Sequence, residues 1–264
     1  MIYSDYLTAM TYEIDDPIRY FLNRSIYLND YIQQPITLTF QNEIRCIHCN
    51  RLIPKTYNSG SCYPCFKSLP QNDLCMVKPE QCHYHHGTCR DTTFGDSTCM
   101  QAHIVYLSLS SDMKVGITRK ENRIKRWIDQ GAVRAIPIME VPTRLDSGVI
   151  ESKLAQIIKD KTNWRKMLKN EYDDQIDLVA KRAEIIQHIP NSYRSFIIDQ
   201  PHLYTFNFPH FNPPTKITSL SLDKQPEITG TLIGIKGQYL IFDKGVFNMR
   251  KHSGYRVHMR LGSD

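Results

Sequence analysis

Residues 103–154 read HIVYLSLSSDMKVGITRKENRIKRWIDQGAVRAIPIMEVPTRLDSGVIESKL. At the start of this stretch, HIVYLSL alternates apolar and polar side chains, SSD follows as a turn, and MKVGIT gives a second strand. This pattern predicts a β-hairpin, because successive side chains of a strand point to opposite faces of the sheet. The middle of the chain therefore begins with two antiparallel strands.

Three further elements complete this unit. An apolar stripe at helical spacing predicts a helix over residues 120–130. RAIPIMEV (134–141) is a third strand, and its proline favours an edge or irregular position. Asp146 or Ser147 can cap a second helix that runs to about Lys161. The order ββαβα predicts a compact α/β unit.

The cysteines are confined to one segment, between Cys46 and Cys99. Residues 46–65, CIHCNRLIPKTYNSGSCYPC, hold two Cys-x2-Cys pairs separated by twelve residues, a spacing typical of a zinc ribbon. Disulfides or redox thiols are the alternative for this pattern. We predict a structural zinc ion, because four protein ligands leave no open position for a substrate. Its ligands are Cys46, Cys49, Cys62 and Cys65.

The remaining cysteines lie in residues 75–99, CMVKPEQCHYHHGTCRDTTFGDSTC, at irregular spacing. They predict a second structural zinc site, with a loop of free thiols and surface histidines as the alternative. Such a metal would stabilise a segment too short to form its own core. The predicted ligands are Cys75, Cys82, Cys89 and Cys99, with replacement of a cysteine by His83, His85 or His86 left open.

The two ends of the chain are rich in alternating, strand-like sequence. Residues 1–45 predict an N-terminal β segment, and residues 215–264 predict four or five antiparallel strands in a small barrel or half-barrel. The N-terminal strands can complete this barrel. With the zinc-binding region at 46–100 and the α/β domain at 101–200, the expected fold class is α+β.

The composition favours a soluble protein with an anionic partner. The net charge of +6 suits nucleic acid. The N-terminus lacks a basic start followed by an apolar run, and no stretch of 18 apolar residues occurs, so we expect a cytoplasmic protein without membrane contact. Basic side chains expected to contact phosphates, with a solvated surface as the alternative, are Arg119, Lys120, Lys125, Arg165 and Lys166.

Residues 103–160 resemble a GIY-YIG nuclease domain in the form whose second motif begins with lysine. Ile104-Val105-Tyr106 matches the first motif, with isoleucine in place of glycine, and Lys114-Val115-Gly116 matches the second, with lysine in place of tyrosine. The family's helical arginine matches Arg126, with Arg123 as the alternative register, and its metal-binding glutamate matches Glu151.

The resemblance implies a metal-dependent nuclease that hydrolyses phosphodiester bonds in DNA or, as the less favoured substrate, RNA. Tyr106 would be the general base, with a pKa lowered by Lys114. Arg126 or Arg123 would brace the phosphoryl oxygens, and Glu151 would hold one Mg²⁺ or Mn²⁺. Each residue has a structural alternative, such as core packing for the tyrosine. The rival functions are a non-catalytic nucleic-acid-binding protein and a scaffold whose zinc modules bind protein.

Nearly the whole chain is also similar to an uncharacterised bacterial family known as a domain of unknown function. The phrases that carry this similarity are GSCYPCF, CHYHHGTC, KVGITR, WIDQGA, KTNWRKML and GIKGQYLIF. This second resemblance includes the zinc ribbon but implies no activity.

Overall fold

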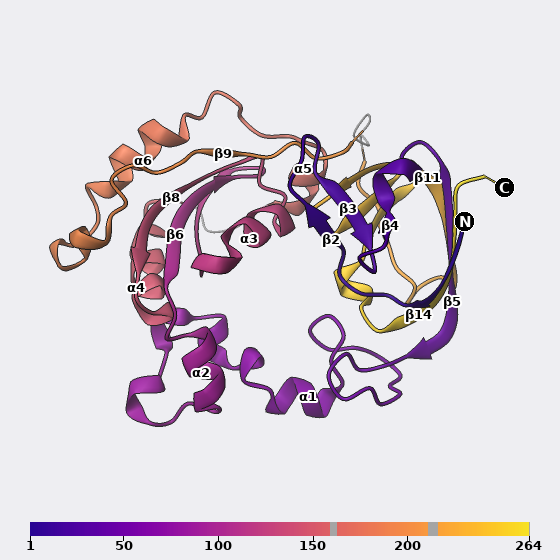
Figure 1. Cartoon of the computed structure of the whole chain (residues 1–264), viewed down its shortest axis with the longest axis horizontal. Coiled ribbons are helices and arrows are strands. Elements are labelled where there is room, and N and C mark those ends of the chain that lie inside the picture. Colours follow the sequence, from indigo (N-terminus) through magenta and orange to yellow (C-terminus); the bar gives the residue numbers. More distant parts are fainter. Residues whose placement is uncertain (159–162, 211–215, 264) are drawn as a thin grey trace. The chain divides into compact units, whose positions relative to one another are not determined.

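The chain forms two compact units. The computed structural model describes residues 1–158, 163–210 and 216–263. One unit combines Met1–Ser68 with Asn207–Asp264, and the other is Leu69–Phe206 (Figure 1). The boundary after Ser68 separates the two cysteine-rich segments, which the sequence grouped into one region over residues 46–100. The fold class is mixed α+β, as predicted.

The first unit is built on a seven-stranded sheet with the order β1-β14-β5-β11-β12-β13-β10. A three-stranded sheet, β2-β3-β4, accompanies it, and helix α1 (Tyr63–Ser68) carries Cys65, the last cysteine of the predicted ribbon. The strands of the large sheet are β1 (Ile2–Tyr6), β5 (Pro35–Ile44), β10 (Ser219–Leu220), β11 (Glu227–Lys236), β12 (Tyr239–Phe242), β13 (Gly245–Asn248) and β14 (Tyr255–Leu261). The small sheet contains β2 (Thr11–Glu13), β3 (Arg19–Leu22) and β4 (Ile26–Tyr27).

Strand β14 joins the two ends of the chain. Its Val257 and Met259 are fully buried while Arg256 and Arg260 are exposed, the alternation that fixes one face of a strand against a core. It pairs antiparallel with β1 on one side and with β5 on the other. The expectation that the N-terminal strands join the C-terminal β segment is therefore confirmed.

Of the two predicted alternatives for the C-terminal strands, a barrel or a half-barrel, the closed form is absent from the described residues. The large sheet is open, since its order runs from β1 to β10 and these two edge strands are not paired in the described part of the chain. The reason lies in β14, whose two edges are both taken by strands from the N-terminal segment. The C-terminal strands consequently cannot close upon themselves.

The second unit has a four-stranded sheet in the order β7-β6-β8-β9. Its strands are β6 (His103–Leu109), β7 (Met113–Arg119), β8 (Arg134–Val141) and β9 (Tyr204–Thr205). The helices are α2 (Thr92–Thr98), α3 (Arg123–Asp129), α4 (Arg144–Leu154), α5 (Trp164–Leu168) and α6 (Leu178–Ile186). The order β6-β7-α3-β8-α4 confirms the predicted ββαβα arrangement, and α4 packs against all three of these strands.

Helix α4 begins earlier and ends earlier than predicted. Thr143 is its N-cap, and the Thr143 hydroxyl accepts a hydrogen bond from the Asp146 backbone N–H at 3.2 Å, so neither Asp146 nor Ser147 is the cap. The helix ends at Leu154. The end predicted at Lys161 lies outside the described residues.

The irregular position predicted for Pro137 is present in β8. The pairing of β6 with β8 shifts register between Val105 and Tyr106, opposite the proline. Arg182 of α6 donates from Nε to the Pro137 carbonyl at 2.8 Å and from Nη2 to the Ile138 carbonyl at 3.1 Å. A buried guanidinium thus satisfies strand carbonyls beside the proline. None of the helices in the described residues combines the length and apolar character that a membrane crossing requires.

Candidate functional site

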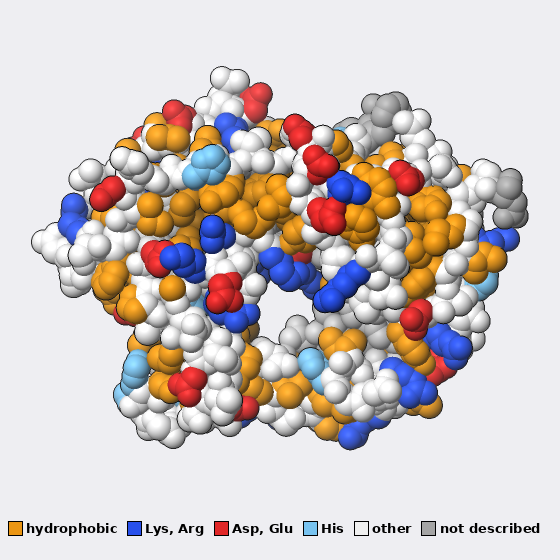
Figure 2. All heavy atoms as spheres, in the orientation of Figure 1, with side chains coloured by type: hydrophobic (Ala, Val, Ile, Leu, Met, Phe, Trp, Pro, Cys, Tyr) orange, Lys and Arg blue, Asp and Glu red, His pale blue; other side chains and the backbone are white. Residues whose placement is uncertain are grey.

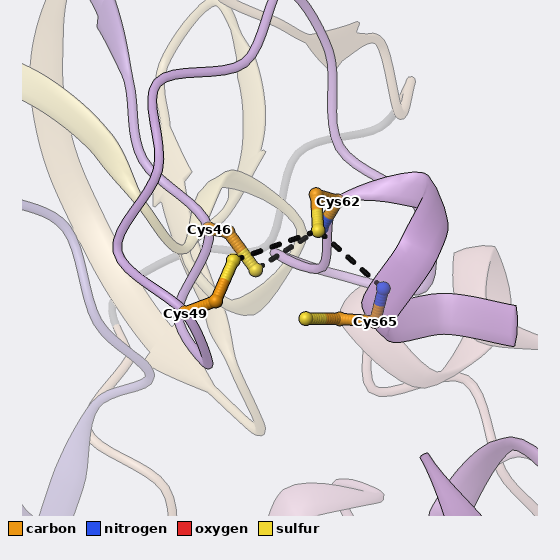
Figure 3. Close-up of side chains that lie close together, drawn as sticks. All are labelled: Cys46, Cys49, Cys62 and Cys65. Atoms are coloured by element: carbon orange, nitrogen blue, oxygen red, sulfur yellow. Dashed lines mark hydrogen bonds between the residues drawn. The ribbon is translucent and has the colours of Figure 1, made fainter. Parts of the chain in front are cut away.

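The four ribbon cysteines of the first unit converge on one point. Their sulfur atoms all lie within 4.8 Å of one another, and Cys49 Sγ is 3.7 Å from Cys62 Sγ (Figure 3). Two thiolates bound at about 2.3 Å to one tetrahedral zinc ion lie about 3.8 Å apart. All four are free thiols rather than disulfides. The predicted ligand set is therefore close enough together to hold a zinc ion.

Tight turns place these thiols. Asn58 and Ser59 both have positive φ values, of 43° and 62°, and form a return turn between the two pairs. The Ile47 N–H donates to the Gly60 carbonyl at 3.0 Å and so joins the two halves of the ribbon. The Cys62 N–H donates to Cys46 Sγ at 3.2 Å, a bond that favours the thiolate form of Cys46.

The ribbon thiols also influence one another's ionisation. Burial opposes ionisation of Cys46, but hydrogen bonds from backbone N–H groups outweigh it and lower the pKa of Cys46 to about 6. The hydrogen bond with Cys62, then burial and the other thiols, raises the pKa of Cys65 to about 12. Four thiols this close resist ionising together, whereas a bound Zn²⁺ makes four thiolates compatible.

The other four cysteines face a small enclosed cavity in the second unit. Cys75, Cys82, Cys89 and Cys99 all line this cavity, which has a volume of about 20 Å³. That volume accepts one water molecule or small ion. Burial raises the pKa of Cys99 to about 11, Arg144 opposes the rise, and the other three thiols add to it.

The structure narrows the choice among the three histidines of this segment. His83 lines the cavity, and one of its ring nitrogens lies within 4.8 Å of ligand atoms of Asp73 and Cys75. His85 and His86 are exposed and are not among the lining residues. Of the three predicted replacements, His83 is the one positioned to bind a metal.

An open cleft of about 390 Å³ also belongs to the second unit. Three arginines and one glutamate give its lining a net charge of +2. The lining comes from the cysteine-rich segment, from β7 and α3 with their connection, and from α4. These residues are Met76, Val77, Pro79, Thr98, Ile117, Thr118, Arg119, Asn122, Arg126, Arg144 and Glu151.

The cleft distinguishes between the two candidate arginines of α3. Arg126 lines it together with Glu151, so the fold brings these two predicted site residues to one surface. Arg123 lines a separate hollow beside Glu140 and Tyr204, and its Nη1 donates to the Lys120 carbonyl at 2.9 Å. Of the two alternative matches to the family's helical arginine, Arg126 is therefore the one that shares a cleft with Glu151.

Tyr106 lies beneath the cleft and not in its lining. Its side chain is fully buried, and its hydroxyl donates to Gln130 Oε1 at 3.1 Å. Burial raises the pKa of Tyr106 to about 12, while Arg126 opposes this rise through its charge and a hydrogen bond. Gly116 leaves room for the phenol, because a Cβ at this position would lie 2.7 Å from the Tyr106 hydroxyl oxygen.

The expected lowering of the Tyr106 pKa by Lys114 is wrong. Lys114 is buried and pairs with Ser108 across the hairpin, two residues along the strand from Gly116, which pairs with Tyr106. The groups that shift the Tyr106 pKa are burial, Arg126 and Glu151, and Lys114 is not among them. Desolvation therefore outweighs the nearby positive charge.

The basic residues predicted to contact nucleic acid fall into two groups. Arg119 lines the cleft, and Asn122, with its amide oxygen turned toward Arg119, accepts from Nε at 3.2 Å and Nη2 at 2.6 Å. The others lie elsewhere: Lys120 pairs with Glu140 at 2.8 Å, Lys125 pairs with Asp129 at 3.2 Å, Arg165 stacks on the Trp164 ring at 4.5 Å, and Lys166 is exposed. On the face drawn in Figure 2, basic side chains occur in small groups with acidic ones among them.

Arg144 is a cleft residue that the sequence did not identify. It is the first residue of α4, where a positive charge opposes the helix dipole. That unfavourable placement is the signal that could have drawn attention to it. Its Nη2 donates to the Met76 carbonyl at 2.8 Å, while its buried Nε has no hydrogen-bond partner among the described residues.

Comparison with known proteins gives a family without an assigned activity. The family model described as "Protein of unknown function (DUF2797)" matches residues 33–257. The chain belongs to the DUF2797 family. No curated protein and no solved structure matches it. The DUF2797 match spans both cysteine clusters and every residue that lines the cleft.

Proposed function

We propose that this DUF2797 protein is a metal-dependent nuclease that hydrolyses phosphodiester bonds in DNA, with RNA as the alternative substrate. The observation that carries the proposal is the shared cleft of Arg126 and Glu151. These are the arginine and glutamate positions at which the second unit resembles GIY-YIG nucleases. The ββαβα order and the packing of Tyr106 over Gly116 add support.

The charge of the cleft suits a phosphate group. Arg119, Arg126 and Arg144 line it, and guanidinium groups bind phosphoryl oxygens through paired, charge-assisted hydrogen bonds. Asn122 holds Arg119, which reduces the conformational freedom that the side chain would lose on binding. Arg126 would brace the phosphoryl oxygens on which negative charge increases in the transition state.

The donor atoms in the cleft fit a single hard cation. Glu151 is the one carboxylate among the described residues of the lining, and Thr118 adds a hydroxyl oxygen. Mg²⁺ and Mn²⁺ are commonly bound by one or two carboxylates, with waters and substrate phosphates as the other ligands. A bound cation would supply charge stabilisation and a water of lowered pKa. Glu151 would hold it beside the phosphate that the arginines orient.

In this proposal Tyr106 is a positioning residue. A phenol with a pKa of about 12 keeps its proton at neutral pH, and full burial separates it from solvent. Its contacts with Gln130 and Arg126 instead fix the arginine from below. The role of general base implied by the family resemblance would require the phenol to become accessible and to ionise.

A non-catalytic nucleic-acid-binding protein is the second candidate. The observation that favours it is the same buried, protonated tyrosine, since the arginines bind phosphate without any general base. We further propose that both cysteine clusters hold structural zinc ions. Such ions would stabilise the two segments in either candidate function.

The test is cleavage of supercoiled plasmid and of a branched DNA in Mg²⁺ or Mn²⁺. We expect Glu151→Gln and Arg126→Ala each to lower the rate about 10²–10³-fold, because each removes one group that stabilises the transition state. Arg123→Ala is the matched control on the same helix and should cleave like the wild type. Equal cleavage by the wild type and Glu151→Gln would contradict the proposal. Salt-sensitive binding without cleavage by any variant would establish the second candidate.

A further inference from the structure

The second cysteine cluster and the cleft share one segment of chain. Cys75 lines the small cavity, and the next residues, Met76 and Val77, line the cleft. Thr98 lines the cleft, and the next residue, Cys99, lines the cavity. At two points, therefore, a cysteine of the cavity is followed or preceded directly by residues that line the cleft. We call these cleft-lining residues of the cysteine-rich segment (Met76, Val77, Pro79 and Thr98) the wall of the cleft.

Arg144 connects this wall to helix α4. Its backbone N–H donates to the Cys99 carbonyl at 2.8 Å, and its side chain donates to the Met76 carbonyl at the same distance. One arginine is therefore anchored next to two cysteines of the cluster while it lines the cleft. A shift of Cys75 would move the neighbouring Met76 carbonyl that holds the guanidinium, and a shift of Cys99 would move the carbonyl that holds the Arg144 backbone.

A close packing contact couples the same elements. A Cβ on Gly148 of α4 would lie 2.4 Å from Pro79 Cβ, so the helix and the cysteine-rich segment approach as closely as a glycine allows. Pro79 also lines the cleft, and Glu151 lies one turn beyond Gly148 on the same helix. The wall therefore packs closely against helix α4, which carries both Arg144 and Glu151.

Little apolar burial holds this segment in place. Over residues 69–100, Pro79, Gly95 and Cys99 alone are buried. Much of the segment consists of short helical turns, such as Leu74–Met76 and Pro79–Gln81. A segment without a hydrophobic core generally depends on a metal or a disulfide, and all of its cysteines are free thiols.

We infer that a zinc ion bound by Cys75, Cys82, Cys89 and Cys99 holds the wall of the cleft and, through Arg144, sets its affinity for phosphate. The inference rests on the proposed function only in taking the cleft to bind a phosphodiester. Loss of this ion releases the Met76 and Cys99 carbonyls, and Arg144 with them. The zinc is structural, yet its presence determines whether the cleft can bind an anion.

The surrounding groups favour the thiols over their neighbours as ligands. Both carboxylate oxygens of Asp73 are occupied, one by the Leu74 N–H at 2.7 Å and the other by Arg90 Nε at 3.1 Å. His83 Nδ1 is 2.9 Å from the Thr88 hydroxyl. Asp73 and His83 have ligand atoms within 4.8 Å of Cys75, but these contacts already engage both Asp73 oxygens and one His83 nitrogen. The four thiols that line the same cavity supply the number of ligands that a tetrahedral zinc ion needs.

The experiment uses the full chain and compares Cys82→Ser with Cys49→Ser, a matched loss of one thiol from the other cluster. Zinc content is measured by elemental mass spectrometry, and amide hydrogen exchange is followed over residues 74–99 and 143–151. A fluorescent thymidine trinucleotide, without Mg²⁺ or Mn²⁺, probes the cleft. Arg144→Gln and His83→Ala complete the set.

We expect two zinc ions in the wild type and one in each cysteine variant. Cys82→Ser should speed exchange in both segments and weaken trinucleotide binding at least about tenfold, whereas Cys49→Ser should change neither. Arg144→Gln should keep both ions but lose a similar factor in affinity. His83→Ala should keep both ions, and loss of one would overturn the assignment of the four thiols.

The inference is overturned if Cys82→Ser retains two zinc ions, or loses one while exchange over residues 143–151 stays unchanged. Binding is measured without the catalytic cation, so an inactive nuclease leaves this test intact. A wild type that fails to bind the trinucleotide would instead contradict the proposed function. Hydrogen exchange alone would then decide whether the metal holds the wall.

Discussion

The two cysteine clusters differ in how much of the chain each requires. The ribbon of the first unit places four thiols within 4.8 Å by means of two tight turns inside residues 46–65. The cluster of the second unit draws its thiols from a longer segment of irregular spacing, around a cavity of about 20 Å³. The ribbon is thus a local structure, whereas the second cluster depends on the packing of its segment against α4.

This difference separates two roles for a structural metal. Ribbon ligands are connected mainly to one another, through bonds such as that from the Cys62 N–H to Cys46 Sγ. In the second cluster, the carbonyl of Cys99 and that of Met76, the residue after Cys75, both bind Arg144 of the cleft. A metal in the ribbon would stabilise its own loop, while a metal in the second cluster would also stabilise a neighbouring site.

The largest expected effect is that of Cys62→Ser in the ribbon. Cys62 is buried among the other thiols, and loss of one ligand would remove both the proposed zinc ion and the order of the loop. We expect the free energy of unfolding of the first unit to fall by more than about 4 kcal/mol. Zinc content and thermal unfolding followed by circular dichroism measure this. The control is His48→Ala, at an exposed position between Cys46 and Cys49, which should keep the zinc. If Cys62→Ser also kept the zinc, the ribbon would not be a metal site and the comparison of the two clusters would lose its basis.

A smaller effect of unusual sign is expected for Gly148→Ala. Alanine in place of glycine within a helix ordinarily stabilises by about 1 kcal/mol. Here the added methyl group would meet Pro79 and the Glu80 backbone nitrogen, at 2.4 and 2.6 Å. We expect a loss of about 1–3 kcal/mol in the stability of the second unit, measured by urea unfolding.

Ser152→Ala, at an exposed position of the same helix, provides the control and should be neutral or slightly stabilising. Stabilisation by Gly148→Ala would show that α4 and the cysteine-rich segment are free to separate. The proposed dependence of the cleft on the second cluster would then lose its structural basis.

The smallest effect at neutral pH is expected for Tyr106→Phe. The loss of the hydrogen bond to Gln130 should lower the free energy of unfolding of the second unit by about 1 kcal/mol. Its pH dependence is more informative. Burial raises the pKa of Tyr106 from 10.0 to about 12, so its contribution to stability is full below pH 10 and is lost as pH rises through 12. Tyr106→Phe should therefore flatten the alkaline loss of stability of the second unit.

Tyr255 of the first unit provides a comparison, because burial followed by its hydrogen bond to Asp223 raises its pKa to about 12 as well. The difference in tyrosinate absorbance between the wild type and Tyr106→Phe or Tyr255→Phe during a pH titration, together with unfolding at each pH, measures both residues. Ionisation of Tyr106 near pH 10 would show that the phenol is accessible. That result would restore it as a candidate general base.

Short-range patterns in the sequence were sufficient for much of the fold. The ribbon spacing identified four thiols that the structure brings together, and the run RAIPIMEV was predicted as a strand with the bounds that β8 has. Such elements depend on neighbours within a few residues. Even the disturbance at Pro137 could be predicted, because proline lacks the N–H group that a sheet needs.

Long-range pairing and burial were not accessible in this way. The sequence left open whether residues 215–264 form a barrel or a half-barrel, because nothing within them reveals that β14 has β1 on one side and β5 on the other. The pKa of Tyr106 was predicted with the wrong sign, because the depth of burial depends on the packing of Trp127 and Gly116 around it. Arg144 went unnoticed because its partners, Met76 and Cys99, are distant in sequence.

The position of β14 in the sheet also imposes an order on synthesis. This strand lies between β1 and β5, yet it is synthesised after all the other strands described here. The second unit, Leu69–Phe206, is complete in sequence well before then. It can fold while β1 and β5 still present unpaired edges, which are prone to aggregate. Nascent chains should therefore carry a finished second unit and an unfinished sheet until β14 has been synthesised, and the N-terminal strands need protection during that interval.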